Sequence, residues 1–183
     1  MEHGLIVAGF GGQGVVLAGK LIATAALMDG REVVWSPSYG PEMRGGEVHC
    51  TVVVADRQIG SPVISVPDAL IVMDQASASR FAPLLREGGF LLLNRSLIQN
   101  EPPGEGREVL AIAATEEATR LGDPRVANVL LVGAYLTRRP TVSVESLIEA
   151  MRQGARGSQK LLDINLEALR RGQELARSEG GPS

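Results

Sequence analysis

Near its start the chain carries the glycine-rich sequence Gly9-Phe10-Gly11-Gly12-Gln13-Gly14. A short apolar run, residues 5–8, comes before it, and a largely apolar stretch from Val15 to Met28 follows it. An apolar run that ends in glycine is typical of a strand buried on both faces of a parallel sheet. The longer stretch stops at Asp29-Gly30, where glycine can adopt the left-handed conformation that ends a helix. We therefore expect a strand, a glycine loop and a buried helix, in this order.

Apolar runs and helical patterns alternate along the rest of the chain. Strands are expected at residues 32–36, 48–55, 69–73, 90–93 and 109–113, and helices at residues 77–85, 126–136, 144–153 and 158–177. This alternation predicts a single α/β domain over residues 1–177, with a mostly parallel sheet, helices on both faces and a Rossmann-like start. Residues 178–183 are expected to form a disordered tail.

One part of the sheet is expected to be antiparallel. Apolar and polar side chains alternate from residue 48, and a turn at Asp56-Arg57 would bring this strand back onto a short partner at Gln58-Ile59. Pro37 is expected to end the strand at 32–36, because proline offers no backbone donor. Some antiparallel pairing is therefore expected around residues 48–60.

The composition excludes several classes of function. The formal net charge of the 183 residues is -3, so no excess of Lys and Arg is present to neutralise a nucleic acid. No apolar run approaches the roughly 18 residues of a membrane span, and no basic region precedes an apolar stretch at the start. We expect a cytoplasmic protein that binds neither nucleic acid nor membrane.

The glycine loop matches the pattern G-x-G-x-x-G through Gly9, Gly11 and Gly14. Such a loop can bring backbone N–H groups close to a pyrophosphate at a helix start. A dinucleotide site also needs an acidic residue where the second strand ends, but Ser36-Pro37 stands there and Glu32 lies at the other end. A nicotinamide site is therefore disfavoured. The glycines either allow tight packing against a neighbour or receive a phosphate or another anion.

A second loop, residues 36–46, is rich in proline and glycine. Ordered loops of this kind suit docking, because proline limits the entropy that binding costs, and Arg, Tyr and Met are common in interfaces. The alternative is a solvated crossover. We expect the following residues to contact a partner or a ligand: Ser38, Tyr39, Glu42, Met43 and Arg44.

No catalytic set can be assembled from the sequence. His3 is expected at a disordered terminus, while His49 and Cys50 alternate on opposite faces of one strand and cannot form a nucleophilic pair. Asp68 and Asp74 are expected in turns or helix caps. The single cysteine cannot hold an iron-sulfur cluster, so we expect neither catalytic residues nor a metal site on this chain.

The same residues resemble those of a known family, the gamma subunits of 2-oxoacid:ferredoxin oxidoreductases, which are similar to one domain of the single-chain pyruvate:ferredoxin enzymes. Residues 9–18 resemble the opening signature of that family, and residues 35–46 resemble its 2-oxoglutarate-type branch. Residues 59–62 and 90–94 also fit. The likeness extends from about residue 5 to about residue 170, and its most specific part is the second loop.

The resemblance implies one subunit of a complex that oxidatively decarboxylates a 2-oxoacid to an acyl-coenzyme A. Because the second loop resembles the 2-oxoglutarate-type branch, the 2-oxoacid implied is 2-oxoglutarate. Thiamine diphosphate would belong to the alpha and beta subunits, iron-sulfur clusters would pass electrons to ferredoxin, and a ferredoxin-like delta subunit would complete the complex. This chain alone would be inactive.

In such a complex the glycine loop would lie near a coenzyme A phosphate or at a subunit contact. The loop residues concerned are Gly9, Gly11, Gly12, Gln13 and Gly14. The alternative is a free-standing nucleotide- or phosphate-binding protein with a Rossmann-like fold.

Overall fold

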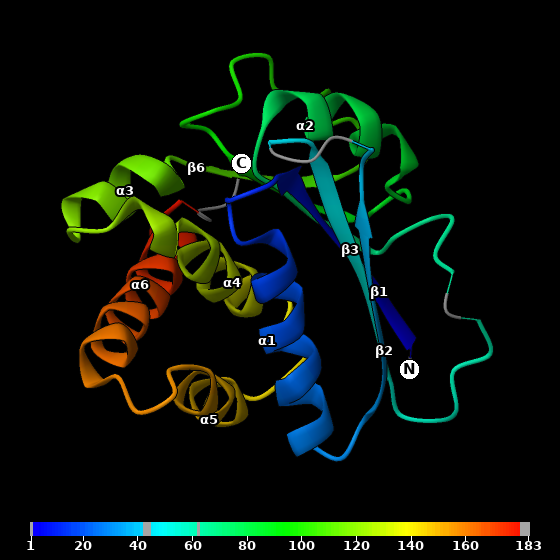
Figure 1. Cartoon of the computed structure of the whole chain (residues 1–183). Helices are drawn as coiled ribbons and strands as arrows, with labels where there is room; N and C mark the ends of the chain where they lie inside the picture. Colours follow the sequence, from blue (N-terminus) through cyan, green and yellow to red (C-terminus); the bar gives the residue numbers. More distant parts are fainter. Residues whose placement is uncertain (1, 42–44, 62, 180–183) are drawn as a thin grey trace.

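The centre of the molecule is a six-stranded sheet with the strand order β2-β3-β1-β4-β5-β6 (Figure 1). The computed structural model describes residues 2–41, 45–61 and 63–179. The strands are β1 (Glu2–Phe10), β2 (Glu32–Tyr39), β3 (Glu47–Ala55), β4 (Ala69–Val72), β5 (Phe90–Asn94) and β6 (Glu108–Ile112). β1 is parallel to β4, β4 to β5, and β5 to β6, whereas β3 is antiparallel to both β1 and β2. The expected α/β class with a mostly parallel sheet is confirmed.

The expected partner of β3 was wrong. Residues 58 and 59 are not in a strand, and β3 instead pairs with β1 on one side and β2 on the other. Both faces of β3 are buried in its second half, where Val52, Val53 and Val54 are at most 3% exposed. A strand of this kind belongs inside a sheet, because a two-residue partner would leave most of one row of its backbone groups unpaired.

Pro37 does not end β2, which continues to Tyr39. β2 lies at the edge of the sheet, and an edge strand tolerates proline because one of its sides needs no ladder hydrogen bond. The second loop is therefore shorter than expected. It joins the antiparallel neighbours β2 and β3 as a hairpin connection.

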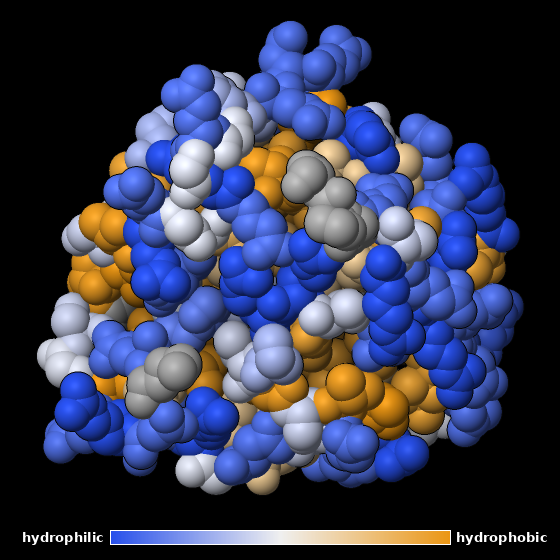
Figure 2. All heavy atoms as spheres, turned by 180° about the vertical axis from the view of Figure 1, so that it is seen from behind, coloured by the Kyte–Doolittle hydropathy of each residue, from blue (hydrophilic) through white to orange (hydrophobic). Residues whose placement is uncertain are grey.

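Helices cover both faces of the sheet. They are α1 (Val15–Met28), α2 (Gln75–Phe81), η1 (Ala82–Leu84), α3 (Ala114–Arg120), η2 (Pro124–Val126), α4 (Ala127–Arg138), α5 (Val144–Gly154) and α6 (Gln159–Ser178). α1 and α4 share one apolar core with the sheet and with inward residues of α5 and α6. α2 and η1 form a smaller core on the other face. The view from behind shows a mainly hydrophilic surface on which hydrophobic residues form separate patches (Figure 2).

Polar side chains begin the helices where the sequence indicates. Asp74 accepts a hydrogen bond from the Ser77 N–H at 2.9 Å, which starts α2, and Ser143 caps α5 in the same way. Asp123 caps η2, so α4 starts one short turn later than the Asp-Pro signal alone would place it. Within residues 2–41, 45–61 and 63–179, none of the helices has the length and apolar composition of a membrane span.

α6 lies against α4 with little room between the two backbones. A Cβ atom added at Gly172 would overlap the backbone carbonyl of Leu130, and one added at Gly133 would overlap the carbonyl of Leu169. Only glycine leaves space for this approach. The two helices can therefore pack backbone against backbone, which draws α6 into the main core.

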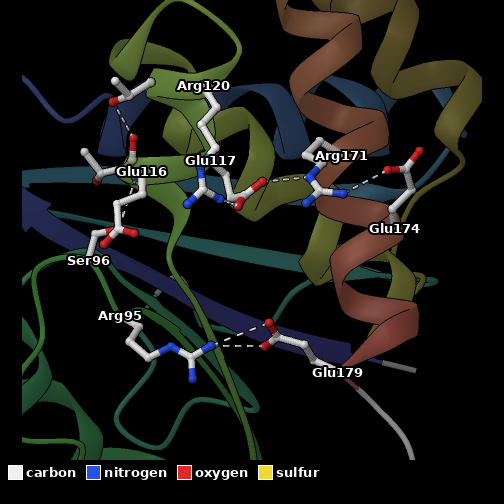
Figure 3. A network of polar contacts seen from close by, with 10 residues as sticks. Arg95, Ser96, Glu116, Glu117, Arg120, Arg171, Glu174 and Glu179 are labelled. Atoms are coloured by element: carbon white, nitrogen blue, oxygen red, sulfur yellow. Dashed lines mark hydrogen bonds and ion pairs between the residues drawn. The ribbon is translucent and has the colours of Figure 1, made fainter.

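Ion pairs hold the outer side of α6 in place (Figure 3). Glu117 of α3, which is 9% exposed, accepts a hydrogen bond from Arg171 Nε of α6 at 2.8 Å and also pairs with Arg120. Arg95, which follows β5, pairs with Glu179 just after α6 at 3.5 Å. The charged side chains thus join α6 to α3 and to the segment that follows β5.

Substitution Gly172→Ala should destabilise the fold. The added methyl group must displace a backbone carbonyl, and overpacking of this kind costs about 1–3 kcal/mol. Gly154→Ala in α5 is the matched control, because no atom lies within 4 Å of the added Cβ and alanine favours a helix over glycine. Urea denaturation followed by circular dichroism should show a lower midpoint for the first variant only. Equal midpoints would contradict the close packing of α4 and α6.

Candidate functional site

The glycine loop lies at the carboxyl edge of the sheet, between β1 and α1. β1 continues into α1 on one face, whereas the neighbouring strand β4 continues into α2 on the other face. In open α/β sheets this divergence of two adjacent strands creates a crevice at their carboxyl ends, where ligands bind. The loop is therefore placed where sequence reasoning expected it.

The side chain of Gln13 closes the loop on itself. Its Oε1 atom accepts a hydrogen bond from the Phe10 N–H at 2.9 Å, and its Nε2 atom donates to the carbonyl of Met73 at 3.1 Å, just past β4. A Cβ atom at Gly9 would overlap Gln13 Oε1, so glycine is needed there. Gln13 thus bridges the ends of two adjacent parallel strands.

Gly14 starts α1 in the left-handed conformation, with φ 77°. Asn128, in α4, donates a hydrogen bond from Nδ2 to the Gly14 carbonyl at 3.1 Å, and its amide occupies the space that a Gly14 side chain would need. Asn128 is 2% exposed. Sequence reasoning missed this residue, although a lone amide inside the apolar stretch 126–136 was the available signal, because a buried amide needs a partner.

The backbone of the loop is already largely engaged. The N–H groups of Phe10, Gly11 and Gln13 donate to Gln13, Gly46 and Phe10, respectively. A dinucleotide loop needs such groups free for a pyrophosphate. Moreover, β3 separates β2 from β1, so the end of the second strand cannot face a ribose held by the loop. An anion here would have to use the remaining loop amides and the first turn of α1, which has no side-chain cap.

The second loop lies beside the first. The Gly11 N–H donates to the Gly46 carbonyl at 2.9 Å, and the Gly40 N–H donates to the Glu47 carbonyl at 2.7 Å, which closes the hairpin. Ser38 and Tyr39 are exposed at the end of β2, Tyr39 by 67%. The other three residues expected to make contacts, Glu42, Met43 and Arg44, lie outside the described residues.

A hollow of about 310 Å³ opens next to the glycine loop. It is lined by Phe10, Gly12, Gln13, Met73, Leu97, Thr115, Pro124, Arg125 and Ala127. Most of these side chains are apolar. The charge of Arg125 is already matched by Asp123, whose pKa the hydrogen bonds from Arg125 lower to about 2. The hollow is therefore better suited to apolar groups than to a multiply charged ligand.

His49 lies on the α2 face of the sheet, near the same edge. Its ring packs against Phe81 with 5.0 Å between the centroids, and Arg80 lies over the Phe81 ring while pairing with Glu47. Burial, and then Arg80, lower the pKa of His49 below its ordinary value. His49 is thus a neutral, packed side chain at pH 7. Its Nδ1 atom is 3.9 Å from the nearest Glu47 oxygen, which is too far for a hydrogen bond.

Cys50 lies on the opposite face of β3 from His49, as the alternation predicted. It is fully buried in the core under α1, and burial raises the pKa of its thiol to about 12. Such a thiol is a poor metal ligand and a poor nucleophile. Across the parts of the chain that the structure describes, no group of three or more His, Cys, Asp or Glu side chains could hold a metal ion. The residues present do not fit an iron-sulfur cluster, which needs four thiolates.

Comparison with known proteins extends what the geometry indicates. A family model described as pyruvate ferredoxin/flavodoxin oxidoreductase matches residues 4–175. Ketoisovalerate oxidoreductase subunit VorA of Methanothermobacter thermautotrophicus is 37% identical over 172 residues, which make up 93% of this chain and 36% of VorA. 2-Oxoglutarate synthase subunit KorC of Methanocaldococcus jannaschii is 33% identical over 181 residues, or 97% of this chain and 95% of KorC. The chain thus spans about a third of VorA and nearly all of KorC.

Solved structures show the same fold. The gamma subunit of a keto/oxoacid ferredoxin oxidoreductase from Geobacter sulfurreducens is 32% identical, with a TM-score of 0.82 over 96% of this chain and 99% of that chain. A 2-oxoglutarate:ferredoxin oxidoreductase from Magnetococcus marinus has a TM-score of 0.89 at 22% identity, over 99% of this chain and 32% of that one. The second likeness shows the fold alone. The chain therefore belongs to the pyruvate ferredoxin/flavodoxin oxidoreductase family.

Proposed function

We propose that this chain is the gamma subunit of a 2-oxoacid:ferredoxin oxidoreductase and carries none of the catalytic groups itself. The observation that carries the proposal is the mutual coverage with the Geobacter sulfurreducens gamma subunit, 96% of this chain and 99% of that one. KorC matches over nearly its whole length as well. VorA, by contrast, is longer, and the match covers 36% of it. This supports the proposal that the domain works together with other parts of a larger enzyme.

The proposed complex oxidises a 2-oxoacid and transfers the acyl group to coenzyme A. We assign 2-oxoglutarate as the substrate because KorC, a 2-oxoglutarate synthase subunit, aligns with 97% of this chain. Thiamine diphosphate, which supplies the decarboxylation chemistry, and the iron-sulfur clusters that pass electrons to ferredoxin belong to alpha, beta and delta partners. The single buried cysteine of this chain supports that division.

The two joined loops are the proposed contact surface. Phe10 is 39% exposed and Tyr39 is 67% exposed, on either side of the hydrogen bond between Gly11 and Gly46. Exposed aromatic side chains on an ordered edge are typical anchors of protein interfaces. The apolar hollow beside Phe10 adds a place where a partner side chain could insert. A coenzyme A phosphate at the remaining loop amides is the second contact that this surface could make.

Double substitution Phe10→Ala with Tyr39→Ala should weaken assembly. Truncation of two interface anchors typically costs about 2 kcal/mol or more, or at least tenfold in affinity. Leu27→Ala is the matched control, since Leu27 is 60% exposed at the opposite end of α1. The measurement is co-purification of tagged full-length chain with thiamine diphosphate and iron from co-expressed subunits, together with 2-oxoglutarate-dependent reduction of ferredoxin. Failure of the unmodified chain to retain either cofactor would overturn the proposal.

Substitution Gln13→Ala should destabilise the loop and the fold. The Phe10 N–H and the Met73 carbonyl would both lose a partner, and each lost hydrogen bond costs about 1 kcal/mol. Gln159→Ala is the control, because Gln159 makes one local contact with Asp163 on the exposed side of α6. Thermal unfolding of both variants measures the difference. If the two variants melt together, Gln13 does not hold the strand ends as described.

The isolated chain should not bind NAD at micromolar concentration. The loop N–H groups of Phe10, Gly11 and Gln13 already have acceptors, and β2 is not adjacent to β1. Isothermal titration with NAD, and in parallel with coenzyme A, tests this expectation. Saturable micromolar NAD binding would favour a free-standing nucleotide-binding protein instead.

A further inference from the structure

A second hollow, which is polar, lies at the amino edge of the sheet, opposite the glycine loop. Its volume is about 230 Å³, and it is lined by His3, Arg31, Val54, Arg139, Pro140 and Thr141. These residues come from the start of β1, the link between α1 and β2, the end of β3 and the segment after α4. A water occupies roughly 30 Å³ in the liquid, so the hollow has room for a small polyatomic ion.

His3 is an ordered part of this hollow, which corrects the expectation of a disordered terminus. It pairs with Val54 across the antiparallel ladder of β1 and β3, and its side chain is 18% exposed. Its Nδ1 atom is 3.9 Å from Asp68, and its buried Nε2 atom has no hydrogen-bond partner among the described residues. A buried polar atom without a partner costs free energy, which an added acceptor would recover.

The arginines around the hollow outnumber the carboxylates that pair with them. Glu108 pairs with both Arg138 and Arg139, so these four arginines share three carboxylates; of the four, Arg31 and Arg139 line the hollow. Glu2 begins β1 and Glu32 begins β2, and neither residue lines the hollow. The pairs are Arg31 with Asp56 at 2.8 Å, Arg86 with Asp68 at 3.0 Å, Arg138 with Glu108 at 2.6 Å and Arg139 with Glu108 at 2.7 Å.

We propose that this hollow binds a small oxyanion, either a phosphate or a carboxylate group, between His3, Arg31, Arg139 and Thr141. Guanidinium groups suit such ligands because their donors match two oxygens at once. The Thr141 hydroxyl at the rim donates to the buried Tyr135 hydroxyl at 3.4 Å, and an anion in the hollow would receive this proton instead. The site is independent of the carboxyl-edge surface and does not rest on the function proposed above.

The titration of His3 provides a direct readout of this site. Burial, with Arg86 and Arg139, lowers the pKa of His3, and Asp68 opposes the shift. Arg31, Asp56 and Glu108 complete the charged surroundings. An oxyanion in the hollow stabilises the imidazolium and so raises the pKa of His3. By linkage, binding strengthens as the pH falls toward that pKa, and weakens above it.

The chain contains only two histidines, so proton NMR can follow both imidazoles in one sample. Inorganic phosphate and acetate are added separately, up to about 10 mM, where a millimolar site saturates. Either ion should raise the pKa of His3 and leave that of His49, at the other edge, unchanged. The ion with the lower dissociation constant identifies the class of oxyanion. Equal shifts of both histidines would indicate ionic strength alone and overturn the proposal.

Variants locate the bound ion. Thr141→Val and Arg31→Gln should each weaken binding about tenfold, because each removes a donor to a charged ligand. His3→Gln should abolish the pH dependence of binding. Arg152→Gln, which removes one partner of an exposed ion pair in α5, should bind as the unmodified chain does. Unchanged affinity in both donor variants, or no saturable binding to the unmodified chain, would overturn the assignment.

Discussion

β3 lies between β1 and β2 and runs antiparallel to both, and most of the functional geometry depends on this placement. The backbone of β1 is paired on both sides, with β3 on one and β4 on the other. Because β3 starts at the carboxyl edge, the hairpin connection that precedes it lies next to the loop that follows β1. The same arrangement moves β2 to the outer edge of the sheet, so that two strands, β3 and β1, lie between β2 and β4.

Because of this strand order, the glycine pattern does not indicate a dinucleotide site in this chain. In a dinucleotide fold the second strand is parallel and adjacent to the first, and its end reaches the ribose. Here an antiparallel strand fills that position, and Gln13 and Gly46 take up backbone N–H groups that would meet a pyrophosphate. Gln13 occupies the space beside Gly9, and Gly14 combines a left-handed φ of 77° with the Asn128 amide beside it.

Local patterns predicted most of the elements but not how the strands pair. α1 was expected at residues 15–28 and is found there, since composition and the Asp29-Gly30 stop define both ends. Alternation identified β3 as antiparallel, yet it could not name the partner, because pairing is decided by contacts far apart in the chain. For a similar reason Asn128 was missed and His3 was wrongly expected at a disordered terminus. Their roles depend on what other elements bring to them, namely the Gly14 carbonyl and the hollow at the amino edge.

The bridge made by Gln13 also sets how the glycine loop moves. Glycine-rich loops usually open readily, because few contacts restrain their backbone. In this chain the Phe10 N–H donates to Gln13, and Gln13 is held at its other end by the Met73 carbonyl beyond β4, so proton exchange at Phe10 should be slow while this bridge is intact. Amide exchange at Phe10 therefore reports on the opening of the bridge that Gln13 makes. The glycine-rich composition suggests a flexible loop, but Gln13 ties this loop to the ends of β1 and β4.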